Sequence, residues 1–224
     1  EDRIELEPRA GSAFTPGTEW ASFTIEFWLY PVVLSHGDVV LSWRAREGAD
    51  RDFRTQELAV EVDGSTLAAR FENFFVRPDG SGVSVTLRDE GRLIPRTWSH
   101  HLVRFDAETG LLEYVVNGTP VYLTYVSRTG RQDGSVYFPR IAAFAEPGLV
   151  IADGPVGALD SLRIERRFLA DGDVPAFAPR GGYLVSDYLD LGSAGARLRT
   201  IDATVNAPGL SDVFLYYRLV NLRE

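Results

Sequence analysis

The sequence lacks cysteine, methionine and lysine altogether in its 224 residues. The absence of cysteine excludes disulfide bonds and thiolate metal sites, but many exported bacterial proteins also lack it, so it says little about compartment. Without methionine, the core must be filled by aromatic and branched side chains. All 23 basic residues are arginine, which fits either recognition of anions and glycans by guanidinium groups or codon usage in a high-GC genome. The second explanation is the simpler one.

Positive charge is also scarce, because 32 acidic residues outnumber the arginines and leave a net charge of −9. Phosphate binding needs a basic face, so we expect no nucleic-acid partner. The longest apolar runs have the length of strands, so we expect no membrane insertion. The chain opens with EDRIELEPRA, which lacks both signal-peptide features and an initiator methionine, and we expect a mature or trimmed product.

Strand patterns and turn residues dominate what is present. The 21 glycines and 12 prolines are spread along the whole length, as many short strands require. In ASFTIEFWLYPVV, Phe23 begins an alternating apolar set that should face a core, with Trp28 on the opposite face. Asp63-Gly64 and Asn117-Gly118 each separate two alternating runs and predict tight hairpins, because both pairs tolerate positive φ. No segment of the first half has a helical period of sufficient length.

These patterns predict an all-β fold with three parts. Residues 1–168 read as one antiparallel two-sheet sandwich. Residues 169–182 are rich in Ala, Asp, Gly and Pro, which indicates a linker or a wrapping arm. Residues 183–224 hold three further strand patterns, which form either a short C-terminal β extension of the sandwich or the start of a second module.

Three passages in order resemble the laminin-G-like members of the concanavalin A-like lectin/glucanase superfamily. They are FTIEFWLYP, WSHHLVRFDAETGLLEYVVNG and GALDSLRIERRFL, which together frame about three quarters of the chain. The resemblance implies a jelly roll of two antiparallel sheets. It also implies a recognition module of an exported or surface protein, hence an extracytoplasmic and bacterial setting, with calcium held at a rim of loops. Such a fold does not by itself fix a function.

Catalytic chemistry finds little support in the sequence. His100 and His101 are neighbours on a predicted strand, so their side chains point to opposite faces and cannot share one ion; we expect both to be scaffold residues. Glycosidases need two carboxylates about 5–10 Å apart. The superfamily's hydrolases present these as E-x-D-x-x-E, which is absent here. Glu57 and Glu61 share a face but stand four residues apart, so a divergent glycoside hydrolase is the least favoured reading.

Binding chemistry is better represented, in acidic and aromatic loops. Calcium prefers six to eight oxygen ligands, and acid-bearing, glycine-rich loops supply four candidate metal ligands: Asp50, Asp52, Asp79 and Asp133. The loop EPGLVIADGP, with Glu146 and Asp153, is a further candidate. Sugars stack their C–H faces on aromatic rings beside planar polar groups, and the candidates for that role are Phe53, Arg51, Arg54, Phe74, Phe75 and Arg77. Ordinary solvated turns and core aromatics explain the same patterns.

The leading hypothesis from the sequence is therefore a non-catalytic recognition module that binds carbohydrate or a protein partner, with calcium as its one candidate cofactor. The alternative is a structural or assembly domain of an extracytoplasmic coat or filament, self-associating through its C-terminal strands.

Overall fold

The computed structural model describes residues 3–7, 11–47, 54–89, 91–132, 134–142 and 144–174. These residues form twelve strands and one short 3-10 helix, Asp171–Asp173, which confirms the predicted all-β class. Within the described part, no helix is long and apolar enough to cross a membrane. The chain divides into two compact units, Glu1–Ala178 and Pro179–Glu224. The predicted C-terminal β extension belongs to the second unit and lies outside the described residues.

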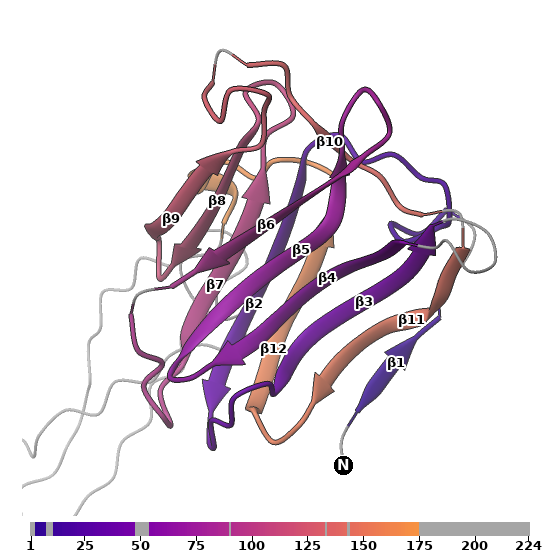
Figure 1. The fold of residues 1–224 in the computed structure, drawn as a ribbon. Helices are drawn as coiled ribbons and strands as arrows, with labels where there is room; N and C mark the ends of the chain where they lie inside the picture. Colours follow the sequence, from indigo (N-terminus) through magenta and orange to yellow (C-terminus); the bar gives the residue numbers. More distant parts are fainter. Residues whose placement is uncertain are drawn as a thin grey trace, which may run out of the picture. The chain divides into compact units, whose positions relative to one another are not determined.

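The strands form two antiparallel sheets that pack face to face (Figure 1). The larger sheet has seven strands in the order β1-β11-β3-β4-β5-β10, with β6 also paired to β5. Its strands are β1 (Ile4–Leu6), β3 (Val39–Glu47), β4 (Arg54–Asp63), β5 (Thr66–Val76), β6 (Gly82–Arg88), β10 (Phe138–Pro139) and β11 (Phe144–Asp153). The smaller sheet has five strands in the order β12-β2-β7-β8-β9. Its strands are β2 (Phe23–Pro31), β7 (Ser99–Phe105), β8 (Leu111–Val116), β9 (Thr119–Tyr125) and β12 (Gly157–Glu165).

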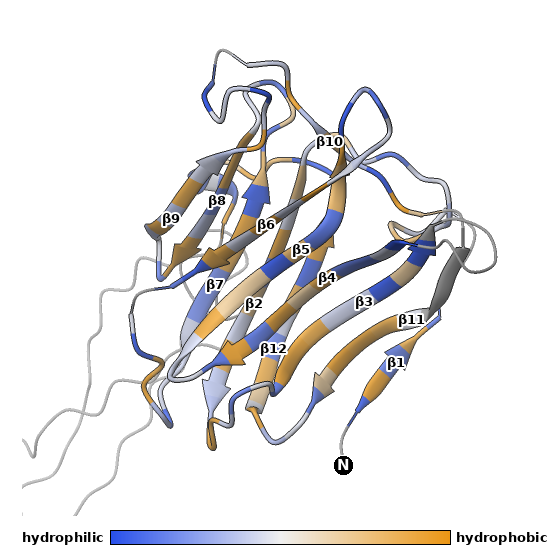
Figure 2. Ribbon diagram, in the orientation of Figure 1, coloured by the Kyte–Doolittle hydropathy of each residue, from blue (hydrophilic) through white to orange (hydrophobic). Residues whose placement is uncertain are grey.

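An aromatic core fills the space between the sheets. The predicted inward set of β2 is confirmed, since Phe23, Ile25, Phe27 and Leu29 are at most 1% exposed. Rings from both sheets meet in it: Phe23 stacks on Phe105 with centroids 5.7 Å apart. Apolar and polar residues alternate along the strands (Figure 2), the pattern expected of a sandwich whose inner faces are apolar.

Both predicted hairpins form. Asn117 and Gly118 have φ values of 49° and 76° and join β8 to β9, as a two-residue turn with positive φ requires. The first hairpin is shifted by one residue from the prediction. Asp63 pairs with Thr66 in the ladder, so the turn consists of Gly64 and Ser65.

The segment SVYFPRIAAFAE, Ser135 to Glu146, has the apolar pattern of a single strand, but that strand is interrupted. Its residues divide between the two-residue β10 and the start of β11, and β11 continues to Asp153. The segment that read as the acidic loop EPGLVIADGP is therefore largely strand, with a register irregularity between Ala145 and Leu149. Gln56 makes up for the interrupted ladder: its amide nitrogen donates to Arg140 O at 2.5 Å, and its amide oxygen accepts from Ala142 N at 2.9 Å.

The outer face of the five-stranded sheet is covered at one end by the residues that follow β12. Thr24 Oγ1 donates to Arg167 O at 2.8 Å and accepts from Leu169 N at 3.1 Å. Leu169 is fully buried, and Arg104 donates to its carbonyl at 2.6 Å. Leu169, the first residue of the predicted linker or wrapping arm, is thus packed against the sheet.

Candidate functional site

The turn between β5 and β6 brings together three of the residues singled out in the sequence. Arg77 Nη1 donates to Ser81 Oγ at 3.1 Å and to Gly82 O at 3.0 Å, which fixes its guanidinium over the turn. Arg54 comes from the start of β4 and donates through Nη2 to Gly80 O at 3.2 Å. Asp79 lies in the same turn. We call this end of the seven-stranded sheet, with the aromatic residues described next, the arginine rim.

Two aromatic residues that the sequence reading missed complete the arginine rim. Phe138 on β10 pairs with Val76, directly before Arg77, and its side chain is 48% exposed. Its neighbour Tyr137 lies under the Arg77 guanidinium, whose carbon is 5.7 Å from the ring centroid. Phe138 lies in the alternating segment SVYFPRIAAFAE, which suggests a strand residue. The alternation does not show that this strand, β10, is only two residues long and leaves Phe138 exposed.

Asp79 is held as an anion in the turn. Its Oδ1 accepts from the Ser81 hydroxyl at 2.6 Å and from the Ser81 amide at 2.9 Å. These two hydrogen bonds lower the pKa of the carboxyl below its usual value. The arrangement is an ordinary Asx turn, so one carboxylate oxygen is already engaged by the protein.

Phe74 and Phe75 do not belong to any surface site, and the prediction that they stack on a ligand is wrong. Both are 0% exposed, and Phe74 meets Trp20 edge-on with centroids 5.5 Å apart. Two successive residues of a regular strand face opposite ways. Here β5 is irregular between Phe71 and Phe75, and Asn73 has φ 48°, so both rings turn inward.

Five of the ten candidates fall outside the described residues: Asp50, Arg51, Asp52, Phe53 and Asp133. The first four precede Arg54 in the sequence, and Arg54 itself lies at the arginine rim. In the described part of the chain, no three acidic or histidine side chains converge as metal ligands. Calcium binding therefore stays a prediction.

The two histidines do face opposite sides of the smaller sheet. His100 lies on its outer face, where Nε2 donates to Glu26 Oε1 at 2.9 Å; Arg163 Nε donates to the other oxygen of Glu26 at 2.8 Å. His101 faces the core and bonds to Tyr114 OH and Ser99 Oγ at 2.8 and 2.7 Å. Burial, and to a smaller extent the nearby His100, lower the pKa of His101 to about 3. Each imidazole is thus tied into the sheet.

The only carboxylate pair that the sequence offered to a hydrolase is neutralised by arginines. Glu57 and Glu61 share the outer face of β4, as predicted. Arg44 Nε donates to Glu57 at 2.6 Å, while Arg70 Nη2 donates to Glu61 at 2.8 Å and lies 4.0 Å from Glu57. Paired acids held in this way are not poised as a general acid and a nucleophile.

No protein-family model and no curated protein matches the chain. Solved structures that align with it include a heptameric SAP-like pentraxin from Limulus polyphemus, at 12% identity over 75% of this chain and 77% of that chain, with a TM-score of 0.41. The CBM40 of a Ruminococcus gnavus IT-sialidase aligns at 11% identity over 77% and 94%, with a TM-score of 0.44. Domain 4 of a Geobacillus stearothermophilus arabinanase aligns at 15% identity over 70% and 68%, with a TM-score of 0.39. Likenesses at these values decide neither the superfamily nor a ligand.

Proposed function

We propose that the protein is a non-catalytic module that binds carbohydrate at the arginine rim. The observation that carries the proposal is that the exposed Phe138 ring on one face of β10 and the Arg77–Tyr137 pair on the other face lie at the same end of the sheet. A pyranose presents an apolar C–H face and a ring of hydroxyl groups. It therefore needs an aromatic surface with planar polar groups at its margin, and the arginine rim supplies both.

The polar groups of the arginine rim are fixed before any ligand arrives. Two bonds from Nη1 hold Arg77, and these leave its Nε–H and Nη2 donors without a bond to any described residue. The carboxylate of Asp79 is fixed by Ser81 and offers acceptor oxygens nearby. Groups held in place lose little conformational entropy on binding, which favours affinity for a weakly interacting ligand such as a sugar.

Calcium and the extracytoplasmic setting are part of the same proposal. Asp79 lies on the turn next to Arg54, which follows directly after the segment that carries Asp50 and Asp52. A calcium ion at this end would take side-chain and backbone oxygens as its ligands, with Asp79 among them. Sugars and calcium at adequate concentration are both available to an exported or surface module.

A thermal melt across a panel of mono- and oligosaccharides, with calcium and with EDTA, tests the proposal. A ligand that binds only the native state raises the midpoint by mass action. We expect at least one neutral or acidic sugar to raise it, and Phe138→Ala or Arg77→Ala to abolish the shift. Leu123→Ala is the matched control, because Leu123 is also exposed but lies on β9 in the other sheet. If no sugar of the panel raises the unfolding midpoint of the unaltered protein, the proposal is wrong.

Self-association is the second candidate, and one observation favours it. Strand β9 is an edge strand of the smaller sheet, and it exposes Tyr122 and Leu123 by 40% and 59%. Exposed apolar residues on a sheet edge favour pairing with another chain. Sedimentation over a hundredfold concentration range tests this alternative: a Leu123→Asp variant should remain monomeric where the unaltered protein assembles.

A further inference from the structure

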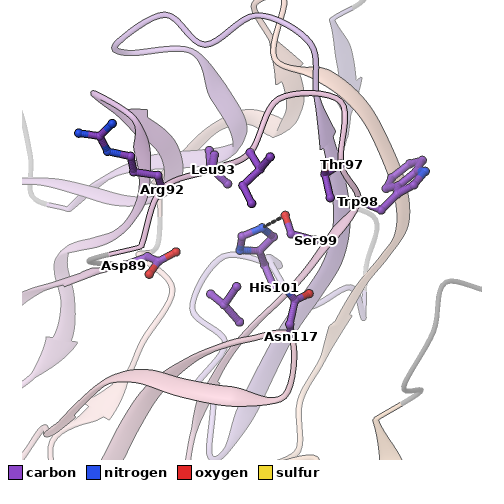
Figure 3. Close-up of a pocket in the computed structure, with 10 residues that line it drawn as sticks. Asp89, Arg92, Leu93, Thr97, Trp98, Ser99, His101 and Asn117 are labelled. Carbon is purple, nitrogen blue, oxygen red and sulfur yellow. Dashed lines mark hydrogen bonds between the residues drawn. The ribbon is translucent and has the colours of Figure 1, made fainter.

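A pocket of about 80 Å³ opens between the segment that follows β6 and the start of β7. Because β6 begins at the arginine rim and runs away from it, the pocket lies at the opposite end of that strand. Its walls are apolar at Leu93, Ile94 and Val116 and polar at Asp89, Ser99 and His101 (Figure 3). A buried water needs about 10–15 Å³ of such volume, so the pocket has room for several waters or for a small organic group.

Ser99 and His101 line the floor of the pocket, and Tyr114 lies behind them as the third member of an uncharged chain of hydrogen-bonded side chains. His101 is fully buried and its pKa is lowered to about 3, so it is neutral at pH 7. Burial raises the pKa of Tyr114 well above its usual value, so its hydroxyl keeps its proton. That proton has no acceptor among the described residues other than His101 Nδ1, 2.8 Å away. Tyr114 therefore donates to Nδ1.

This direction of donation decides what Ser99 offers to the pocket. A neutral imidazole that accepts at Nδ1 carries its proton on Nε2, and Nε2 therefore donates to Ser99 Oγ at 2.7 Å. Among the described residues, the Ser99 hydroxyl proton then has only the carbonyl of Leu29 as an acceptor, at a long 3.5 Å. Ser99 thus presents a hydrogen-bond donor at the floor of the pocket.

Asp89 supplies an acceptor on the facing wall. It is only 6% exposed, and its carboxylate points toward His101 and the centre of the pocket (Figure 3). Oδ1 accepts from Gly91 N at 2.7 Å, whereas Oδ2 has no hydrogen bond to any described residue. A carboxylate oxygen without a hydrogen bond from a described residue, at the wall of a pocket, favours a ligand that can donate to it.

The Ser99–His101 pair does not form a nucleophile and its base. A general base is effective when its pKa lies near the operating pH, and an imidazole with a pKa of about 3 is far too weak to take the serine proton. The direction of donation also places the imidazole proton against Ser99 Oγ. The geometry suits binding and not acyl transfer.

We propose that this pocket is a second binding site, which takes an uncharged group carrying neighbouring hydroxyls, with one hydroxyl accepting from Ser99 and another donating to Asp89. Leu93, Ile94 and Val116 contact its C–H groups. The end of a saccharide and a free small polyol share this chemistry. The site is independent of the arginine rim.

Titration of the intact, ¹⁵N-labelled chain at pH 7 tests the proposal, with glycerol, myo-inositol and a methyl glucopyranoside as probes. We expect saturable shifts in the amide signals of Gly91, Ser99 and Asn117. Preference for the methyl glucopyranoside would identify a saccharide end as the source, and preference for glycerol or inositol a free polyol. Absence of saturation with all three probes would overturn the proposal, as would tighter binding of methylammonium or acetate.

Variants separate this site from the arginine rim. Ser99→Ala removes the donor and should weaken binding of the polyol at least fivefold. Ile94→Trp, at a position that is 64% exposed and therefore tolerant for folding, should block the mouth. Phe138→Ala is the control and should leave the pocket unchanged. If Ser99→Ala and Ile94→Trp both bind as the unaltered protein does, the pocket is not the site, whatever happens at the arginine rim.

Discussion

His101 shows how one buried residue makes the stability of the fold depend on pH. Its pKa is about 3 in the folded chain, against an ordinary value of 6.5, so protons favour the unfolded state between these two values. The contribution of neutral His101 is complete above pH 6.5 and is lost as the pH falls toward 3. We expect the free energy of unfolding to drop by about 2 kcal/mol between pH 7 and pH 5 from this residue.

Urea unfolding at the two pH values, for the unaltered protein and for His101→Gln, measures this loss. The variant is less stable at pH 7, because it loses the bonds to Tyr114 and Ser99, but it should lack the His101 part of the pH dependence. An equal drop in both proteins would show that His101 is not held neutral.

Glu26 is the corresponding acidic residue on the outer face of the smaller sheet. Its burial raises the pKa, but hydrogen bonds and charges from His100 and Arg163 outweigh burial, so the net pKa is below the ordinary 4.5. A lowered carboxyl pKa stabilises the fold above about pH 4.5, and this stabilisation is lost as the pH falls further. Glu26→Gln should cost about 3 kcal/mol at pH 7, since the buried carboxylate is hydrogen-bonded to His100 and its loss leaves Arg163 without its counter-charge.

The matched control for this change is Glu57→Gln. Glu57 also pairs with an arginine, but Arg44 is 64% exposed, so that change should cost less than about 1 kcal/mol. Chemical denaturation of the two variants gives the comparison. Similar losses for both would mean that the Glu26 cluster is no stronger than a surface ion pair.

Single residues differ in how well the sequence predicts their positions. Alternation placed Phe27 in the core and His100 and His101 on opposite faces, because both follow from the period of a strand alone. It placed Phe74 wrongly, since the irregularity of β5 at Asn73 leaves no trace in the pattern of apolar residues. Phe138 was missed for a related reason: its exposure depends on where β10 ends, and that is set by the side chain of Gln56 on another strand.

Among the elements, the β8–β9 hairpin was the most predictable, and its turn gives a prediction about glycine. Gly118 has φ 76° and open space where a Cβ would stand, so Gly118→Ala meets backbone strain without a clash. The expected cost is about 1 kcal/mol. Gly172→Ala, also in open space but without positive φ, should be close to neutral in the same denaturation experiment. If neither alanine variant lowers the free energy of unfolding, Gly118 does not have the positive φ of this turn.

The β10–β11 region was the least predictable element. Its sequence alternates well enough for one strand, yet the chain leaves the ladder at Arg140 to meet the amide group of Gln56. Here a side chain replaces a neighbouring strand as the hydrogen-bond partner of the backbone. Whether this happens depends on contacts between residues that are distant in the sequence. The Arg54–Gly80 bond, which joins the start of β4 to the turn between β5 and β6, is another example, and the spacing of residues within either segment does not predict it.

At the scale of the whole molecule, the sandwich presents two different ends. One end carries the arginine rim with exposed Phe138, and the other carries the pocket above Ser99 and His101. The sheets between them are joined by an aromatic core and braced by ion pairs on their outer faces. A rigid sandwich with sites at its ends suits recognition, because the framework holds the binding groups in place without moving.

The most direct test of carbohydrate recognition at the arginine rim is a map of amide chemical shifts, recorded as the best ligand of the sugar panel is titrated into the labelled chain. We predict that the largest saturable shifts fall at Arg54, at residues 77–82, and at Tyr137 and Phe138, and that they vanish in Phe138→Ala. Chemical-shift changes centred on β9 would contradict a carbohydrate site at the arginine rim. So would identical chemical-shift changes in the unaltered protein and in Phe138→Ala.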